Sequence, residues 1–365
     1  MSATTSTPTS TPTFVTSDKV IIGGSAALCV VSGIAHFGGW NSVTAFVVSA
    51  AAVALLASLV GRSVDQLGDR FGAGATGVLQ SALGNLPELF ICIFSLKAGL
   101  VDVVRAALVG SILANLLLVL GLAFVVGGLR HGTQQLGSER ARTIIVLLVL
   151  SVTAMAIPSL THWLHTAADD HEPAFSVIVS VLLLVLFALS LPYSLRKDAD
   201  EGSGQEMSME KPRWPVWLAV GMLAVAGVLA AFVSDWFVDA LQPAMDSLSI
   251  NQTFAGLVVV AIAGNAVENV VGVQLAAKNQ SEYAFSVILN SPLQIALVLA
   301  PVLVIVSQFF GLASLTLVFA PLLVVVLMLS VILAAFIAFD GESNWLEGAT
   351  LIVLYAIIAT SFWWG

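Results

Sequence analysis

A short motif that contains a glutamate occurs twice, at distant positions in a chain that is otherwise very apolar. Gly84 to Leu89 reads GNLPEL and Gly264 to Asn269 reads GNAVEN, so each glutamate follows an asparagine by three residues. Asparagine and glutamate at this spacing lie on one face of a helix. The preceding glycine, and Pro87 in the first copy, weaken the helix and free backbone carbonyl groups. Carboxylate, amide and carbonyl oxygens together form the kind of site that hard cations prefer.

The motifs belong to a longer internal repeat. Three polar residues of the first half recur 180 residues later in the second half: Asn85, Glu88 and Ser111 correspond to Asn265, Glu268 and Ser291. Ionisable groups inside a membrane cost several kcal/mol and tend to be functional. We therefore expect two half-sites to meet near the membrane midplane as one acidic site, with Glu88 and Glu268 as metal ligands. The alternative is that each glutamate is a protonated partner in a helix–helix hydrogen bond.

The composition is that of an integral membrane protein. Of 365 residues, 58% are hydrophobic and only 10% are charged, and the mean hydropathy is +1.01. A soluble domain typically carries about 25% charged residues. The net charge of -9 excludes the basic surface with which proteins usually bind nucleic acid. Cys29 and Cys92 both fall in apolar runs, so we interpret them as packing residues.

Apolar runs bounded by charges, glycine or proline predict an all-α membrane protein with eleven transmembrane helices. The expected cores are 20–38, 42–61, 72–97, 99–128, 142–165, 173–195, 214–235, 252–277, 282–309, 314–338 and 346–363. The expected domains are a disordered cytoplasmic tail (1–17), a first transmembrane helix (18–40), an N-terminal five-helix repeat (41–195), an acidic cytoplasmic linker (196–213) and a C-terminal five-helix repeat (214–365).

Lysine and arginine predict the orientation. If the loops are numbered from a cytoplasmic N-terminus, eleven of these residues fall on the cytoplasmic side and only Lys97 and Arg105 on the other. The C-terminus is then outside. Because five helices are an odd number of crossings, the second half must enter the membrane from the opposite side to the first. This is the inverted-topology repeat of many secondary transporters.

From Val43 to the C-terminus the chain resembles the calcium/proton antiporter (CAX) family of the sodium/calcium exchanger superfamily. The segment GNLPELFICIFSLKAGLVDVVRAALVGSILANLLLVLGLAF is similar to the first signature repeat of that family. The segment GLVVVAIAGNAVENVVGVQLAAKN, followed by NSPLQIALVLAPVLV, is similar to the second. FDGESNWLEGATLIVLYAI resembles the last loop and helix.

The resemblance implies eleven helices, of which the first is divergent and the others form two inverted five-helix repeats. It implies that Glu88 and Glu268 bind the cation and exchange it for protons. Neighbouring amides and hydroxyls would support them: Asn85, Asn265, Ser111, Ser291 and Gln294. Asn115 follows Ser111 by one helical turn, so we expect it in the same set.

Three positions depart from the family pattern. Asn269 stands where the family usually has a histidine, Asn290 stands where it usually has a glycine, and Gln80 stands where it often has an asparagine. Asn269 removes a titratable imidazole beside the site, so the proton dependence should come from the two carboxylates. Asn290 places a side chain where close backbone approach was expected.

We predict a secondary active cation/proton antiporter that exports Ca²⁺ from the cytoplasm in exchange for H⁺ by alternating access. It would need no cofactor, and its partners would be Ca²⁺, protons and the lipid bilayer. The expected location is a bacterial inner membrane, with a vacuolar membrane as the alternative. Alternative functions are a Na⁺ or K⁺/proton antiporter and a passive cation channel, although channels usually repeat their filter around a symmetric pore. The sequence has no motif of an intramembrane hydrolase, so an enzyme is not expected.

Other charged groups have two interpretations. Asp65 and Asp235 lie near predicted membrane boundaries, where they would either attract cations to the two mouths or be ordinary interfacial charges. Five acidic residues of the linker form a thin charge run, which we interpret as solvated: Asp198, Asp200, Glu201, Glu206 and Glu210. Six residues crowd one external loop without a zinc-protease motif, and we interpret this loop as solvated too: His162, His165, Asp169, Asp170, His171 and Glu172.

Overall fold

The chain folds into a bundle of long helices. The structure is a computed structural model that describes residues 13–71, 83–136, 139–201 and 213–364. Its α-helices are α1 (Thr16–Phe37), α2 (Ser42–Phe71), α4 (Leu86–Lys97), α5 (Val101–Leu113), α6 (Leu120–His131), α7 (Glu139–Trp163), α8 (Glu172–Glu201), α9 (Val216–Leu248), α10 (Gln252–Phe254), α11 (Ala261–Gly264), α12 (Ala266–Ala277), α13 (Ser281–Gln294), α14 (Ala300–Phe309), α15 (Pro321–Asp340) and α16 (Trp345–Trp363).

Shorter elements join or interrupt these helices. Three are π-helical, η1 (Ala114–Val119), η3 (Ala255–Val260) and η4 (Ile295–Leu299), and η2 (Asp169–His171) is a 3₁₀ turn. Two strands, β1 (Gln134–Gln135) and β2 (Glu342–Ser343), pair antiparallel with Gln134 opposite Ser343. The pair connects the loop after α6 to the loop after α15 at one end of the bundle.

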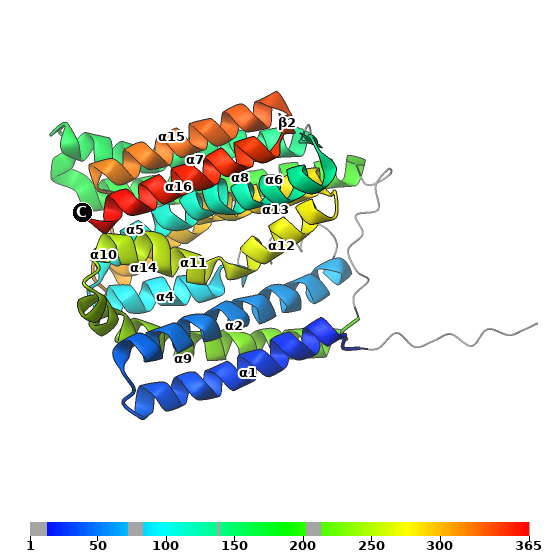
Figure 1. Ribbon diagram of the computed structural model, residues 1–365. Coiled ribbons are helices and arrows are strands. Elements are labelled where there is room, and N and C mark those ends of the chain that lie inside the picture. The colour runs from blue at the N-terminus through cyan, green and yellow to red at the C-terminus, as the bar shows by residue number, and fades with distance from the viewer. Residues whose placement is uncertain (1–12, 72–82, 137–138, 202–212, 365) are drawn as a thin grey trace, which may run out of the picture.

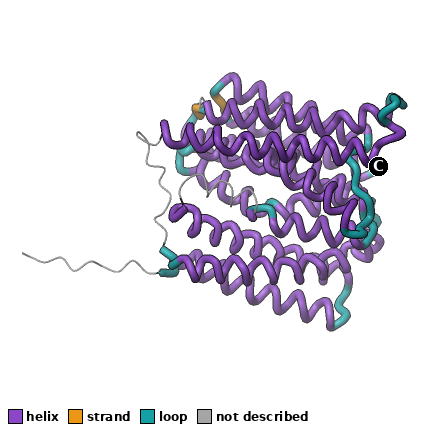
Figure 2. The backbone as a smooth tube through the Cα atoms, turned by 180° about the vertical axis from the view of Figure 1, so that it is seen from behind, coloured by secondary structure: helices purple, strands orange, loops and turns teal. Residues whose placement is uncertain are grey.

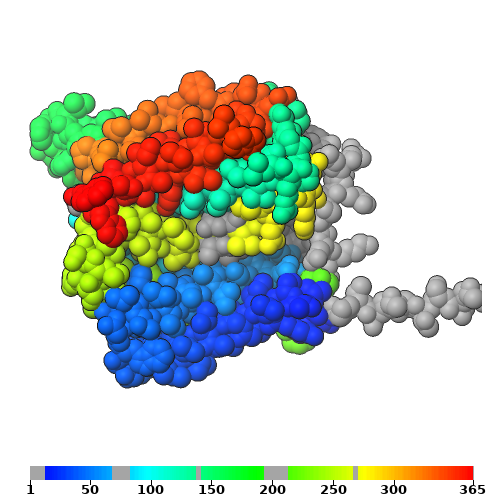
Figure 3. All heavy atoms as spheres, viewed as in Figure 1, coloured from blue at the N-terminus to red at the C-terminus, as the bar shows by residue number. Residues whose placement is uncertain are grey.

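The helices lie side by side in layers (Figure 1). Helices α1, α2 and α9 pack on one another and form one side, which is blue and green in Figure 1. Helices α6 and α16 pack together, as do α7 and α15, on the opposite side. Figure 3, a space-filling view from the same direction, shows α1 and α2 at one edge of the bundle and α15 and α16 at the opposite edge. The start of α1 and the C-terminus lie at opposite ends of the bundle (Figure 1).

Nine helices in the described part of the chain are long and apolar enough to cross a membrane. Two of the eleven expected spans are not among them. The first, 72–97, is described only from residue 83 onward, and its described helix is α4. The second, 252–277, is divided into α10, η3 and α11 before Asn265 and α12 after it.

The two glutamate motifs interrupt their helices at equivalent residues. Asn265 (φ -100°, ψ 20°) separates α11 from α12, and Asn85 (φ -92°, ψ 17°) immediately precedes α4. Both asparagines have the bridge-region backbone that ends regular helix. Pro87 stands at the start of α4, where its missing N–H costs no hydrogen bond. The break between α11 and α12 lies in the middle of the bundle (Figure 1), and loop backbone is visible there from behind (Figure 2).

Helix α5 and segment η3 pack closely because glycines face each other's backbone. A Cβ added to Gly110 would overlap the carbonyl oxygen of Leu257, and one added to Gly256 would overlap the carbonyl oxygen of Val103. Small residues that let backbones approach are characteristic of membrane helix interfaces. This contact holds the helix that carries Ser111 against the helix that leads to Asn265.

One expected helix begins later than predicted. The span 314–338 is helical only from Pro321, and residues 312–320 form a non-helical segment with buried Leu315, Leu317 and Phe319. Its backbone groups need partners, because buried polar groups are costly in an apolar environment. Serine hydroxyls supply them: Ser307 accepts from the Leu315 N–H at 3.0 Å, Ser176 from Leu317 at 3.1 Å and Ser159 from Phe319 at 2.9 Å.

Other boundaries also differ from the sequence prediction. α1 begins at Thr16, inside the expected tail 1–17, of which residues 1–12 lie outside the described part. α8 continues to Glu201, so the first residues of the expected linker 196–213 are helical. α9 runs past Asp235 to Leu248, and one face of these added turns is buried: Phe237, Val238, Leu241, Ala244 and Met245. Asp235 is therefore inside a helix and not at its end.

Candidate functional site

Glu88 is buried in the centre of the bundle. It is the third residue of α4, and only 1% of its surface is exposed. Ser111 of α5 donates its hydroxyl hydrogen to Oε1 of Glu88. The carboxylate and the hydroxyl, both singled out in the sequence, are therefore in direct contact.

The second motif lies against the first. A Cβ added to Gly264 would stand 3.5 Å from Cγ of Glu88. Gly264 is one residue before Asn265 and four before Glu268, so the two helix breaks meet at this point. Glu268 belongs to the first turn of α12, but its side chain, like those of residues 266–269, lies outside the described part. The side chain of Asn269 is among them.

Asn115 connects the two halves of the chain. It lies in η1, is fully buried, and its Nδ2 donates to the Ser111 carbonyl oxygen at 2.9 Å and to Oδ1 of Asn265 at 2.9 Å. A third contact joins Nδ2 to the Ser291 hydroxyl at 3.3 Å. Ser291 in turn donates to Oδ1 of Asn265 at 3.3 Å. Residues from both halves of the chain thus share one hydrogen-bond network.

The amide orientations follow from backbone partners. Nδ2 of Asn265 donates to the Ala261 carbonyl oxygen at 2.8 Å, so its Oδ1 faces Asn115 and Ser291. Nδ2 of Asn115 is fixed in the same way by the Ser111 carbonyl. This leaves Oδ1 of Asn115 buried and, among the residues that the structure describes, without a hydrogen-bond donor.

The remaining predicted pair lies beside this network. Asn85 is half-buried, and its Nδ2 lies 3.5 Å from Oε1 of Gln294, a long hydrogen bond between the first break and the end of α13. Gln294 is immediately followed by η4, as Ser111 is followed within three residues by η1. Single π-helical turns are frequent at functional sites. Here they widen the helices that carry Asn115 and Gln294.

The arrangement offers oxygen ligands and few other groups. Glu88, Ser111, Ser291 and the amide oxygens of the two asparagines converge, and no lysine or arginine is among the described hydrogen-bond partners of these side chains. The charge of a buried carboxylate can be compensated by a proton or by a metal ion. The network can therefore hold either one.

The other predicted positions lie outside this network. Asp65 is exposed on α2, and Asp235 and Asn290 are half-buried in α9 and α13. Gln80 lies outside the described residues. Cys29 and Cys92 are buried free thiols, as their apolar sequence context predicted. For the linker acids Asp198, Asp200, Glu201, Glu206 and Glu210, no side chain falls in the described part.

A second polar cluster, which the sequence did not predict, lies at the end of the bundle where α1 begins. Asp18 is buried, and its carboxylate lies 3.1 Å from Nε of Arg62 and 3.6 Å from Nη2 of Arg213. Oε1 of Gln66 accepts from the N–H groups of Arg213 and Trp214. An aspartate in the first turn of an apolar helix was the available signal for this cluster. The cluster fastens α1, α2 and the residues before α9 together.

Known proteins match almost the whole chain. The family described as sodium/calcium exchanger protein matches residues 41–196 and 218–364. The Ca²⁺/H⁺ antiporter of Synechocystis is 35% identical over 92% of this chain and 94% of its own length. The Ca²⁺/H⁺ antiporter ChaA of Bacillus subtilis is 33% identical over 94% and 97%. The native structure of YfkE, 33% identical, superimposes with a TM-score of 0.80 over 94% of this chain and all of that one.

Proposed function

This chain belongs to the sodium/calcium exchanger protein family, and within it to the calcium/proton antiporters, so we propose that it exchanges Ca²⁺ for protons across a membrane. It is a transporter and not an enzyme. We propose that it exports Ca²⁺ from the cytoplasm and that its location is a bacterial inner membrane. The transported ions are its substrates, and the mechanism that we propose involves no further cofactor.

The observation that carries this proposal is the buried network around Glu88. Glu88, Ser111 and Asn115 come from the first half, and Asn265 and Ser291 come from the second. Oδ1 of Asn115 is buried and accepts no hydrogen bond from the described residues, which suits it to a cation. We propose that Glu268 completes the site, because Gly264, four residues earlier, lies beside Glu88: a Cβ added to Gly264 would stand 3.5 Å from Cγ of Glu88. Asn85 and Gln294 would support it from one side.

The exchange of Ca²⁺ for protons follows from the need to balance the negative charge of the carboxylates. Two carboxylates balance one Ca²⁺, and two protons balance the same carboxylates when the cation has left. In either state the site carries little net charge, so the protein can reorient without moving a bare charge through the membrane interior. With neither ion bound, the carboxylates would be uncompensated in a region of low dielectric constant. This coupling distinguishes an antiporter from a passive channel.

We propose eleven crossings arranged as two inverted five-helix repeats after α1. The nine long helices of the described residues, together with the two expected spans 72–97 and 252–277, would give this number. The opposite positions of the start of α1 and the C-terminus support an odd count (Figure 1). Interrupted helices at the midplane, contributed by both repeats, are typical binding elements of secondary transporters. The N-terminus and the linker 196–213 would be cytoplasmic, and the C-terminus outside.

Flux through proteoliposomes tests the proposal. With an imposed pH gradient, the purified protein should accumulate Ca²⁺ and dissipate the gradient, and Na⁺ or K⁺ alone should not support the exchange. Glu88→Gln and Glu268→Gln should each abolish Ca²⁺ flux, because one carboxylate cannot balance a divalent cation. Glu282→Gln is the matched control, because Glu282 is exposed at the start of α13 and should not affect transport.

Each contrary outcome has a definite meaning. Normal Ca²⁺ flux in Glu88→Gln would exclude the proposed site. Ca²⁺ flux that is independent of the pH gradient and moves no protons would indicate a channel. Exchange of Na⁺ or K⁺ for protons, with no Ca²⁺ flux, would assign the protein to a monovalent cation antiporter.

A further inference from the structure

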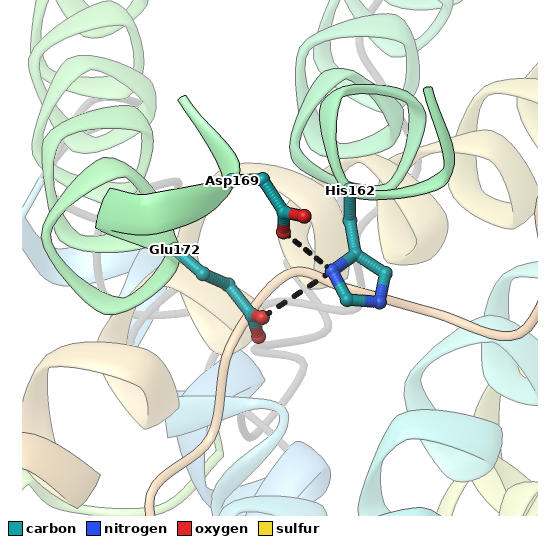
Figure 4. Close-up of side chains that lie close together, drawn as sticks. All are labelled: His162, Asp169 and Glu172. Atoms are coloured by element: carbon teal, nitrogen blue, oxygen red, sulfur yellow. Dashed lines mark hydrogen bonds and ion pairs between the residues drawn. The ribbon is translucent and has the colours of Figure 1, made fainter. Parts of the chain in front are cut away.

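A second group of potential ligands lies where α7 ends and α8 begins, at the same end of the bundle as the C-terminus (Figure 1). Nδ1 of His162 lies 2.7 Å from Oδ1 of Asp169 and 3.7 Å from Oε2 of Glu172. The three ligand atoms all lie within 4.8 Å of one another. Figure 4 shows the two carboxylates directed at the same ring nitrogen of His162, Nδ1. The sequence predicts a solvated loop here, whereas the structure brings three of its residues together.

The group is held in place by its neighbours. Oε1 of Glu172 accepts a hydrogen bond from the Thr316 hydroxyl at 2.6 Å, and Arg105 donates to the same hydroxyl at 2.8 Å. This leaves Oε2 of Glu172 directed at His162. Outer partners of this kind fix the ligand orientation in metal sites. The side chains of Asp169 and Glu172 are 25% and 26% exposed and that of His162 is 43% exposed, so an ion can reach them from solvent.

We propose that His162, Asp169 and Glu172 form a binding site for a divalent transition-metal ion of the Zn²⁺ class, separate from the transported-cation site. Zn²⁺ lies about 2.0–2.2 Å from histidine nitrogen and carboxylate oxygen, so ligand atoms around a tetrahedral ion are roughly 3.3 Å apart. The observed separations of 2.7 and 3.7 Å lie on either side of that value. Small side-chain adjustments therefore suffice to admit the ion. Water, or His165 at 3.4 Å from Asp169, completes the coordination.

The ligand atoms select the ion. An imidazole nitrogen with two carboxylates suits zinc and its neighbours in the periodic table, whereas Ca²⁺ prefers sites made of oxygen alone. The network around Glu88 is of the second kind. The two sites thus differ in chemistry as well as in position, and Ca²⁺ should not displace Zn²⁺ from the loop site at comparable concentrations.

The bound ion would join the end of α7 to the start of α8. Through Glu172 and Thr316 it would also be connected to the segment 312–320, and through Arg105 to α5, the helix that carries Ser111. The histidine must bind the metal as neutral imidazole, so Zn²⁺ affinity should fall as the pH is lowered. Zn²⁺ should also raise the Tm of the folded protein, because it binds only when the loop is in place.

Zn²⁺ titration of the purified full-length protein by calorimetry tests the proposal, with excess Ca²⁺ present to occupy the buried site. One equivalent of Zn²⁺ should bind. His162→Ala should weaken binding by more than about tenfold, and Thr316→Val, which removes only an outer partner, by about tenfold. His171→Ala is the matched control, because His171 is an exposed histidine of the same loop outside the triad. Glu88→Gln should retain full Zn²⁺ binding, whatever its effect on transport.

Two results would overturn the proposal. One is the absence of Zn²⁺ binding to the wild-type protein at micromolar concentrations. The other is unchanged affinity in His162→Ala. If a variant elutes as aggregate in size-exclusion chromatography, Glu172→Gln takes its place, because it keeps the Thr316 contact and removes only the ligand charge; unchanged affinity in that variant would be equally decisive. Displacement of Zn²⁺ by equimolar Ca²⁺ would also refute the assignment to transition metals.

Discussion

Replacement of Asn115 by leucine, which has a similar size, tests whether the two halves are coupled through this side chain. The substitution removes two hydrogen bonds of 2.9 Å, to the Ser111 carbonyl and to Oδ1 of Asn265. It leaves Oδ1 of Asn265 with only the 3.3 Å contact from Ser291. Leaving a buried acceptor without a good partner costs about 1–3 kcal/mol, and hydrogen bonds between membrane helices average about 0.6 and reach about 1.7 kcal/mol.

From these two ranges we expect a cost of about 1–2 kcal/mol at the site. Because 1.4 kcal/mol corresponds to a factor of ten, the apparent Ca²⁺ affinity should fall about 5- to 30-fold. The assay is the initial rate of Ca²⁺ uptake into proteoliposomes as a function of Ca²⁺ concentration at fixed pH gradient. Ser151→Ala is the control, because it removes a hydrogen bond of 2.6 Å to the Leu147 carbonyl within α7, away from the site.

A Ca²⁺ affinity of Asn115→Leu within twofold of the wild type would refute this coupling. In that case the hydrogen bond to Asn265 would be only structural, and the buried oxygen of Asn115 would not be a ligand. Reduced affinity of the same size in Ser151→Ala would mean that general loosening of the bundle, and not the site, explains the change.

Three further predictions concern stability, topology and pH. Asp18→Asn should lower the Tm, because Arg62 and Arg213 lose their shared carboxylate at a cost of roughly 3 kcal/mol; an unchanged Tm would mean that the cluster is only peripheral. In a background without Cys29 and Cys92, a cysteine in the linker 196–213 should be labelled only from the cytoplasm and one after Trp364 only from outside; labelling of both from one side would contradict the odd number of crossings. Apparent Ca²⁺ affinity should fall as the pH is lowered, because protons compete for the same carboxylates, and Asn269→His should steepen this dependence; an affinity independent of pH would contradict proton coupling.

Much of the candidate site could be predicted from the sequence, because the residues of each motif are close together in the chain. The Gly-Asn-x-x-Glu spacing fixes the helix break and the glutamate within one turn, and the structure places both breaks at the asparagines. The apolar runs likewise predict most helices within a few residues. The meeting of Gly264 with Glu88 is a tertiary contact, and only the repeat suggested it.

What the sequence could not predict depends on packing. Residues 312–320 read as the start of a helix, because their leucines and phenylalanine are as apolar as those that follow. The serines that satisfy their backbone, Ser159, Ser176 and Ser307, come from three other helices. The loop that holds His162, Asp169 and Glu172 was expected to be solvated for a related reason. Thr316 and Arg105, which orient Glu172, are distant from this loop in the sequence.

The π-helical turns have a consequence for how the chain tolerates insertions and deletions. A π-helical turn holds one residue more than a regular α-helical turn, so η1 inserts an extra residue between α5 and α6 without separating them. Deleting one residue within 114–119 would let the segment close into regular helix while α5 and α6 each keep their buried faces. A deletion elsewhere in 101–131 would instead rotate one part of the helix by about 100° relative to the other. Changes of length in this helix should therefore be accepted only beside Asn115, where they would alter the site before they alter the fold.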